Sequence, residues 1–223
     1  SIWQADSSGA ADMRYRNQLS CRRRSATLAP HYDPRLHLPP VHPITALVVG
    51  PAREEVYCDE LGRIKVQLQG LHAEDHVHAQ GAGTSGEDRD SAFVRVSSAW
   101  AGAGYGQDAV PRVGMEVLID FLGGDPDKMV VVGVLHNGIN HPARFSHGGG
   151  LPGNRFLSGI KSKEIDGARY NQLRLDDTPG QISSQLASEH QHSQINLGYL
   201  TEPRHDGHGD DRGEGLEMRT DGH

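Results

Sequence analysis

Apolar and polar residues alternate in the middle of the chain in a way that predicts two neighbouring β-strands. Apolar residues occupy every second position from 115 to 121, and Leu118 is the one apolar residue on the opposite face. This period of two is typical of a half-buried strand, because successive side chains of a strand point to opposite faces. Glycines and a proline at 123–127 predict a reversal. The apolar run 129–135 then predicts a second strand, covered on both faces.

Three further segments predict strands before this hairpin. The run 45–50 is apolar, and 63–69 and 93–97 alternate between apolar and polar residues. A turn is predicted at 59–62, between the first two of these strands. Five strands within a single stretch of this length suit a small, closed or partly closed barrel.

The pattern changes after position 141. Glycines at 148–150 predict a flexible joint. Beyond them, brief apolar pairs alternate with turn residues at 177–180 and 206–207. Each segment is too short to bury its own apolar face, so we expect neighbouring strands from an intertwined oligomer to cover it. The pairs are Leu173 and Leu175, Ile182 and Leu186, Ile195 and Leu197, and Leu216 and Met218.

The beginning of the chain shows no helical period. Residues 14–16 and 22–24 are locally basic, and a solvated face or an intersubunit contact is favoured over a site for an acidic partner. Five prolines between 30 and 43 exclude a helix and predict an extended linker.

Composition supports an extended, turn-rich protein with a modest core. Hydrophobic residues make up 35% and aromatic residues 5% of the 223 residues, and 28 are glycine. The net charge of −7 is spread along the chain, which argues against a field that attracts nucleic acid. Cys21 and Cys58 lie far apart and do not predict a disulfide scaffold. The chain starts at Ser1 without a signal-peptide pattern, so we expect a fragment of a longer protein.

Several long motifs, in the same order, resemble valine-glycine repeat protein G (VgrG), the spike of bacterial type VI secretion systems. Residues 15–17 (YRN) resemble the end of the family's hub domain. The other motifs lie at 59–66 (DELGRIKV), 95–97 with 100–106 (RVS and WAGAGYG), 111–117 (PRVGMEV), 121–127 (FLGGDPD), 158–162 (SGIKS) and 170–177 (YNQLRLDD). The resemblance covers nearly the whole chain.

The resemblance implies an all-β protein with three parts. Residues 1–44 would be the end of a hub-like domain and a proline-rich linker. Residues 45–141 would form a five-stranded barrel of the oligonucleotide/oligosaccharide-binding (OB) type. Residues 142–223 would form a glycine-rich neck and the start of an intertwined trimeric β-helical needle, as in the central spike of contractile-tail phages. Two features depart from the family: a longer, His- and Gly-rich segment at 71–90, and needle strands without a regular valine-glycine repeat.

The implied function is mechanical rather than enzymatic. The resemblance implies a homotrimer at the tip of a secretion tube, loaded onto an inner tube of stacked hexameric rings. It would carry a tip-sharpening protein and effectors, puncture the target envelope and pass transiently through the target membrane. Assembly would be cytoplasmic, with secretion or injection on firing. The residues expected in buried interchain contacts are Leu173, Leu175, Ile182, Leu186, Ile195 and Leu197.

A metal-dependent hydrolase is the first alternative. An H-x₃-H spacing at His72 and His76 would place two imidazoles on one face of a helix. The full cluster of possible metal ligands consists of His72, Glu74, Asp75, His76 and His78. The surrounding segment is polar and glycine-rich, which favours a solvated loop. A second ligand-rich run has interleaved glycines, so it predicts a mobile loop; it comprises His205, Asp206, His208, Asp210 and Asp211.

Other chemistries find less support. The glycines at 102, 104 and 106 are not followed by a helical pattern, which excludes a dinucleotide site. The carboxylate pairs Glu54/Glu55 and Asp176/Asp177 are expected in exposed turns, where burial cannot separate their pKa values. A barrel that binds nucleic acid or glycan is the second alternative, but Arg63, Lys65, Phe93 and Arg95 are too few for a binding platform. We therefore predict no catalytic residue, no cofactor, no metal ion and no nucleic acid.

Overall fold

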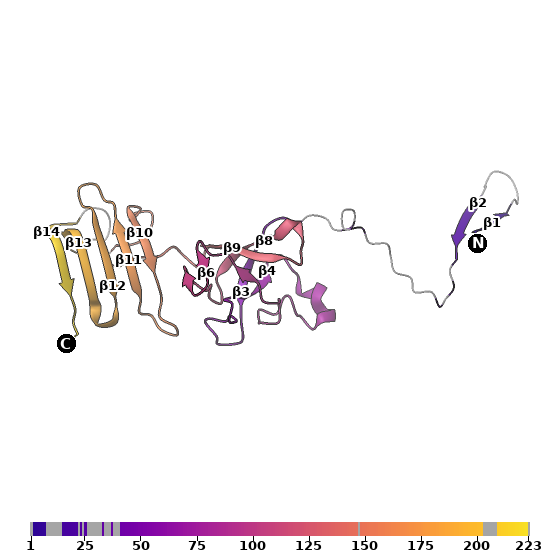
Figure 1. Ribbon diagram of the computed structural model, residues 1–223, viewed down its shortest axis with the longest axis horizontal. Helices are drawn as coiled ribbons and strands as arrows, with labels where there is room; N and C mark the ends of the chain where they lie inside the picture. Colours follow the sequence, from indigo (N-terminus) through magenta and orange to yellow (C-terminus); the bar gives the residue numbers. More distant parts are fainter. Residues whose placement is uncertain are drawn as a thin grey trace. The chain divides into compact units, whose positions relative to one another are not determined.

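Figure 1 shows the computed structural model of the chain. It describes residues 2–7, 15–21, 23, 25, 33, 37, 41–146, 148–202 and 209–222. The chain divides into two compact units, Ser1–Pro39 and Pro40–His223. In the first unit, β1 (Ile2–Ser7) and β2 (Tyr15–Ser20) form an antiparallel hairpin. Much of the predicted basic segment and proline-rich linker lies outside the described residues.

The barrel strands of the second unit are those that the sequence predicts. They are β3 (Ile44–Val49), β4 (Lys65–Leu68), β5 (Arg95–Val96), β8 (Glu116–Phe121) and β9 (Met129–Leu135). Their order in the sheet is β4-β3-β8-β9-β5, with β5 and β9 parallel and the other pairs antiparallel. Ile64 and Val94 exchange backbone hydrogen bonds of 3.0 and 2.7 Å. Because this bridge joins the two ends of the sheet, the barrel is partly closed, as expected for an OB-type fold.

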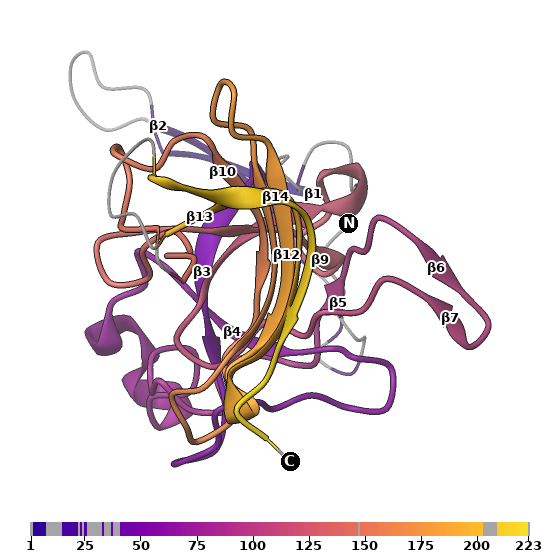
Figure 2. The same ribbon diagram turned by 90° about the vertical axis from the view of Figure 1, so that its left-hand side faces the viewer.

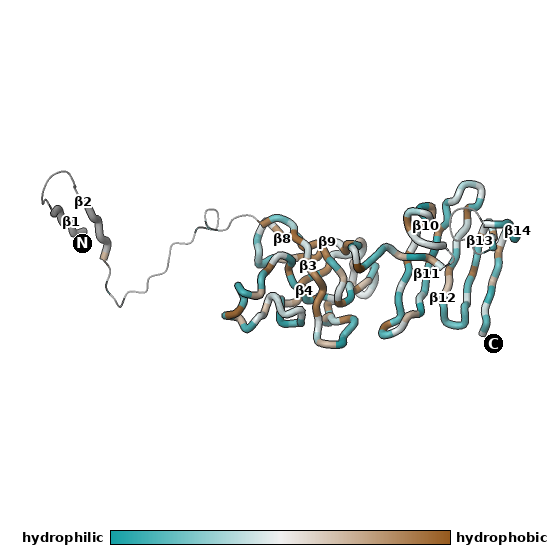
Figure 3. Tube along the Cα trace, turned by 180° about the vertical axis from the view of Figure 1, so that it is seen from behind, coloured by the Kyte–Doolittle hydropathy of each residue, from teal (hydrophilic) through white to brown (hydrophobic). Residues whose placement is uncertain are grey.

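The barrel core follows the predicted alternation. Every second residue of β8 is buried, which confirms the inward face predicted for 115–121. Ile64 and Val66 are completely buried, as their positions in the 63–69 pattern predict. Figure 3 shows apolar residues concentrated in the barrel strands. The core cluster consists of Ala46, Val48, Ile64, Val66, Val94, Val117, Ile119, Phe121 and Val131.

Two strand predictions are wrong in detail. The run 129–135 is not covered on both faces, because Val131 is 1% exposed whereas Val132 is 44% exposed. A register shift between Leu118 and Ile119 marks a β-bulge where β8 pairs with β9. Val134, on β9 after this bulge, is also exposed among the described residues. The segment 93–97 contains only the two-residue strand β5, which pairs with β9. Val94 lies outside β5 because it pairs with Ile64 in an isolated bridge.

Two loops carry local structure that the sequence did not predict. The 3₁₀ helix η1 (Ala73–Ala79) lies in the His-rich loop and buries none of its residues. The short strands β6 (Ala101–Gly102) and β7 (Tyr105–Gly106) form a hairpin that stands out from the barrel in Figure 2. Gly106 has φ +143°, and a Cβ there would lie 2.4 Å from the carbonyl oxygen of Trp100. The close return of this hairpin therefore requires glycine.

The remaining strands form a second sheet, an antiparallel meander in chain order (Figure 1). It contains β10 (Leu157–Lys161), β11 (Asn171–Asp176), β12 (Ser183–Ser188), β13 (Ser193–Thr201) and β14 (Asp211–Arg219). The 3₁₀ turn η3 (His190–His192) joins β12 to β13, and η2 (Leu122–Gly124) lies between β8 and β9. The all-β class is thus confirmed, and the winding of this sheet with other chains stays a prediction. None of the helical segments in the described part of the chain has the length and apolar character needed to cross a membrane.

Candidate functional site: the two faces of the C-terminal sheet

One face of the sheet β10–β14 carries rows of apolar side chains. Leu173 of β11 lies opposite Ile160 of β10 on one side and Leu186 of β12 on the other. Residues in register on neighbouring strands project from the same face, so these three side chains are neighbours. The first row, which we call the apolar ladder, contains Ile160, Leu173, Leu186, Ile195 and Met218. A parallel row contains Leu175, Leu197 and Leu216, with Ser184 between the first two.

These rows are open to solvent in the single chain. The large apolar residues on this face, apart from half-buried Ile195, are between 42% and 72% exposed. A contiguous apolar surface of this kind is rare on a monomeric soluble protein and marks an interaction face.

The opposite face of the sheet is polar and buried. Gln172, Gln185 and Asn196 are each less than 9% exposed. Gln172 Nε2 donates a hydrogen bond to Gln185 Oε1, and Gln185 Nε2 donates one of 2.9 Å to Asn196 Oδ1. Asn196 Nδ2 then donates a 2.9 Å hydrogen bond to Glu217 Oε2. A chain of amide groups thus crosses the strands from β11 to β14, and its buried members satisfy one another.

The segment that leads into β10 covers this polar face. The backbone N–H of Ser146 donates to Gln172 Oε1 at 3.1 Å, and Arg174 Nη1 donates to the Ser146 carbonyl at 2.9 Å. Lys161 Nζ donates to the Arg144 carbonyl at 2.7 Å. Burial lowers the pKa of Lys161. The chain therefore covers the polar face of its own sheet and leaves the apolar face open, the reverse of the usual one-sided antiparallel sheet.

A charged pair closes the amide chain on β14. Arg212 donates to both carboxylate oxygens of Glu217. This hydrogen bonding, followed by that from Asn196, lowers the pKa of Glu217 to about 2. Glu217 is therefore ionised at neutral pH and remains an acceptor for the amide of Asn196.

The structure places five of the six predicted contact residues in the two rows on the apolar face. Leu173, Leu186 and Ile195 lie in the apolar ladder, and Leu175 and Leu197 lie in the parallel row. Ile182, two residues before Ser184, is 70% exposed. Ile160, Leu216 and Met218 extend this face and were not among the predicted contacts. Their alternation with Gly159, Gly215 and Glu217 is the sequence signal that could have identified them.

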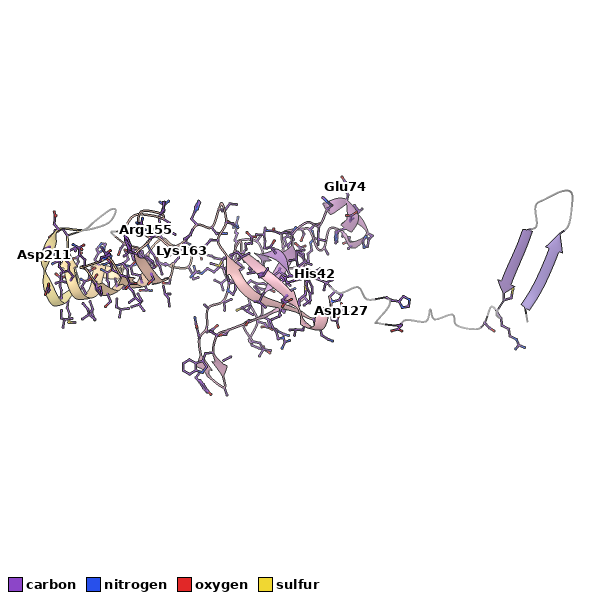
Figure 4. All side chains as sticks on the ribbon, turned by 90° about the horizontal axis from the view of Figure 1, so that it is seen from above. His42, Glu74, Asp127, Arg155, Lys163 and Asp211 are labelled. Carbon is purple, nitrogen blue, oxygen red and sulfur yellow. The ribbon has the colours of Figure 1, made fainter. Side chains whose placement is uncertain are left out.

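The histidines of the 71–90 loop do not assemble as a metal site. Within the described ranges, no three His, Cys, Asp or Glu side chains gather closely enough to hold a metal ion. The rings of His76 and His78 stack with centroids 6.4 Å apart, and His76 Nδ1 lies 3.0 Å from the carbonyl oxygen of Ala82. Glu74, on the same 3₁₀ helix, is labelled in Figure 4. In the second ligand-rich run, His205, Asp206 and His208 lie outside the described residues.

Two of the three basic side chains considered for nucleic-acid binding, Arg63 and Lys65, lie against the Phe93 ring, and Arg63 also pairs with an acid. Arg63 forms an ion pair with Asp59 at 2.6 Å. The cationic groups of Arg63 and Lys65 lie 5.9 and 5.0 Å from the centre of the Phe93 ring. These cation–π contacts occupy the one ring that the sequence offered for base stacking.

One expectation about the carboxylate pairs is wrong. Asp176 is 1% exposed, and its Oδ1 accepts a 3.0 Å hydrogen bond from the N–H of Thr178. The short side chain binds the backbone two residues later, which folds this turn inward. Glu55 is also not in an exposed turn, since only 22% of its side chain is accessible. Asp176 is the last residue of β11 and so belongs to a strand. Sequence reasoning missed Glu55 because its partners Arg112 and Lys163 lie far away in the chain.

Two family models match separate parts of the chain. Residues 53–136 match the type VI secretion system/phage-baseplate injector OB domain. Residues 163–223 match the putative type VI secretion system Rhs element Vgr. The first match contains β4 to β9, and the second contains β11 to β14.

The type VI secretion system spike proteins VgrG2a and VgrG2b of Pseudomonas aeruginosa are each 44% identical to the chain over 195 residues, which is 87% of it. The spike protein VgrG1a of the same organism is 35% identical over 194 residues, or 85% of the chain. The aligned regions cover 21%, 17% and 27% of these three relatives. The chain thus spans only a small part of the length of the curated relatives that it matches.

Proposed function

Because the chain belongs to the VgrG family of type VI secretion system spike proteins, we propose that it is the part of a spike in which the OB barrel leads into a trimeric needle. The matches of residues 53–136 to the injector OB domain and of residues 163–223 to the Vgr element support this proposal. Its work is mechanical: it supplies a stiff shaft when the secretion apparatus fires.

The observation that carries this proposal is the inverted burial of the C-terminal sheet. The polar face is covered by the chain itself, while the apolar ladder and the parallel row are open. Fully burying a Leu, Ile or Met side chain contributes about 1.5–3 kcal/mol. Covering this face with further copies therefore gives a large favourable term for assembly, before the cost of ordering the chains is subtracted.

Three copies are the arrangement that fits the family best. Three sheets can turn their apolar faces toward one axis and enclose a shared core. The interchain contacts would be made by Leu173, Leu175, Ile182, Leu186, Ile195 and Leu197, together with Ile160, Leu216 and Met218. Rigidity follows because each subunit completes the core of the others.

The partners of the complete protein follow from this assignment. We propose that the trimer sits on an inner tube of hexameric rings, carries a tip-sharpening protein and effectors, and crosses the target membrane transiently. It would assemble in the cytoplasm and leave the cell on firing. We propose no enzymatic activity for this region, since its most unusual surface is an apolar face without catalytic groups.

The native mass of the chain tests the proposal. Light scattering coupled to size-exclusion chromatography is expected to give three times the chain mass of 24.2 kDa. A folded monomer at micromolar concentration would contradict it. Metal analysis of the same sample tests the hydrolase alternative, which requires stoichiometric zinc bound through His72 and His76.

A further inference from the structure

We propose that Glu55 is a positioning residue that clamps the first loop of the needle sheet to the OB barrel. Glu55 lies in the loop between β3 and β4, and its side chain is mostly buried. The loop that it holds connects β10 to β11. This clamp acts within one chain and does not rest on the proposed trimer.

The carboxylate of Glu55 accepts hydrogen bonds from three donors. Oε1 accepts from Lys163 Nζ at 2.7 Å and from Arg112 Nη1 at 2.9 Å. Oε2 accepts from the backbone N–H of Asp166 at 2.8 Å. Lys163, labelled in Figure 4, and Asp166 belong to the β10–β11 loop, whereas Arg112 belongs to the segment that enters β8. Hydrogen bonds to an ionised group are about twice as strong as those between neutral groups.

Further bonds close this contact into a ring. Arg112 Nη2 donates to the carbonyl oxygen of Lys163 at 2.6 Å. The backbone N–H of Val113 donates to the carbonyl oxygen of Glu55 at 3.0 Å. Glu55, Arg112 and Lys163 are therefore each bound to the other two. The loop cannot leave the barrel without breaking several charge-assisted hydrogen bonds together.

The β10–β11 loop has a shape that presents its donors to Glu55. Asp166 has φ +53°, a left-handed conformation that is uncommon for residues other than glycine. Glu164 and Arg169 form an ion pair across the loop, and the Glu164 N–H donates to the Arg169 carbonyl at 2.7 Å. These contacts hold the loop closed before it meets the barrel, which lowers the entropy lost when the clamp forms.

The ionised form of Glu55 is strongly favoured. Its bond from Lys163, followed by those from the Asp166 N–H and from Arg112, lowers the pKa of Glu55 to about 2. The carboxylate is consequently charged at neutral pH. Within a spike, such a clamp would make the barrel and the needle move as one body when load is applied along the needle.

Hydrogen exchange at the Asp166 amide tests the first part of the proposal. In Glu55→Gln we expect the Asp166 amide to exchange at least tenfold faster than in the parent. The exchange rate is measured by mass spectrometry with fragmentation that resolves single residues. Amides of β8 and β12 should keep their parent rates. Glu54→Gln is the matched control, because Glu54 is the neighbouring exposed carboxylate and its substitution should leave the Asp166 amide unchanged.

A distance measurement tests whether the bonds position the needle. Cys21 and Cys58, both exposed, are first replaced by Ser. Spin labels are then placed at Arg95→Cys in β5 and Glu214→Cys in β14, and labelled chains are diluted with unlabelled ones. Glu55→Gln should broaden the distance distribution of the parent, and Glu54→Gln should not. Lys163→Met removes one hydrogen-bond donor to Glu55 at an exposed side chain, and it should also broaden the distance distribution.

The proposal is overturned if exchange at Asp166 is unchanged, or if exchange is faster while the distance distribution stays narrow. The native mass shows whether a failure of the clamp proposal is separate from a failure of the proposed trimer. Glu55→Gln is expected to keep the parent oligomeric state, so a loss of clamping and a loss of trimer are measured independently.

Discussion

Leu173 and Leu186 lie directly opposite each other on β11 and β12, and both side chains are exposed. On the reverse of the same two strands, Gln172 and Gln185 are buried and share a hydrogen bond. Burial of amides and exposure of leucines within one strand pair is unfavourable for an isolated chain. The sheet therefore presents an incomplete core, which we propose is completed by other copies.

Replacing Leu175 with Asp should reduce trimer content. A carboxylate at this position would be desolvated in the shared core, and an unpaired buried charge is strongly unfavourable. Light scattering at several concentrations measures the change. Leu61→Asp is the control, since Leu61 is an exposed leucine on the β3–β4 loop of the barrel. An unchanged mass for Leu175→Asp would reject the assignment of this face.

Two adjacent valines of β9 should respond differently to truncation. Val131 is buried in the barrel core, whereas Val132 is largely exposed in the single chain. Val131→Ala removes two buried methyl equivalents and leaves a cavity, so we expect a loss of about 2–3 kcal/mol in unfolding free energy. Val132→Ala should cost less than about 1 kcal/mol. Urea unfolding of the two variants gives the comparison, and equal losses would contradict the observed register.

Gly159 should not tolerate a side chain. It has φ +145°, and a Cβ there would lie 1.9 Å from the carbonyl oxygen of Leu173. Gly159→Ala is therefore expected to separate β10 from β11 locally and to lower the unfolding free energy by more than about 1 kcal/mol. Gly133→Ala is the control, because Gly133 also lies in a strand but no atom lies within 4 Å of its added Cβ. Thermal unfolding and hydrogen exchange of β10 measure the effect.

Acid should weaken the fold through its paired carboxylates. The pKa of Glu217 falls from an ordinary value of 4.5 to about 2 because Arg212 and Asn196 bind the ionised form. A carboxyl group with a lowered folded-state pKa stabilises the fold above its unfolded pKa and loses this effect as the pH falls. The unfolding free energy should thus decline between pH 4.5 and about pH 2.

Glu217→Gln should make this decline shallower, because one of the titrating groups is removed. Glu214→Gln on the same strand is the control, since Glu214 is exposed. Denaturant unfolding at a series of pH values provides the measurement. A slope that is the same in Glu217→Gln and in the parent would show that this pair does not contribute to acid stability.

Local sequence patterns predicted most of the barrel. The alternation at 115–121 and 63–69 identified the inward residues of β8 and β4, because the side-chain period of a strand is a property of the backbone alone. The same reasoning failed at 129–135 and at Asp176. Whether a strand or a turn is covered depends on what packs against it, and no local period contains that information.

The residue patterns were sufficient to predict the all-β class and the five barrel strands, and the motifs were sufficient to identify the family. The sequence also identified the leucines and isoleucines from 173 to 197 as residues in need of cover. The folded chain was needed to show that five of these side chains share one open face while glutamines are buried on the other. It also brings Glu55 to Lys163 and Asp166, more than one hundred residues away. Alternation along a strand fixes which residues share a face, whereas contacts between distant segments fix which face is buried.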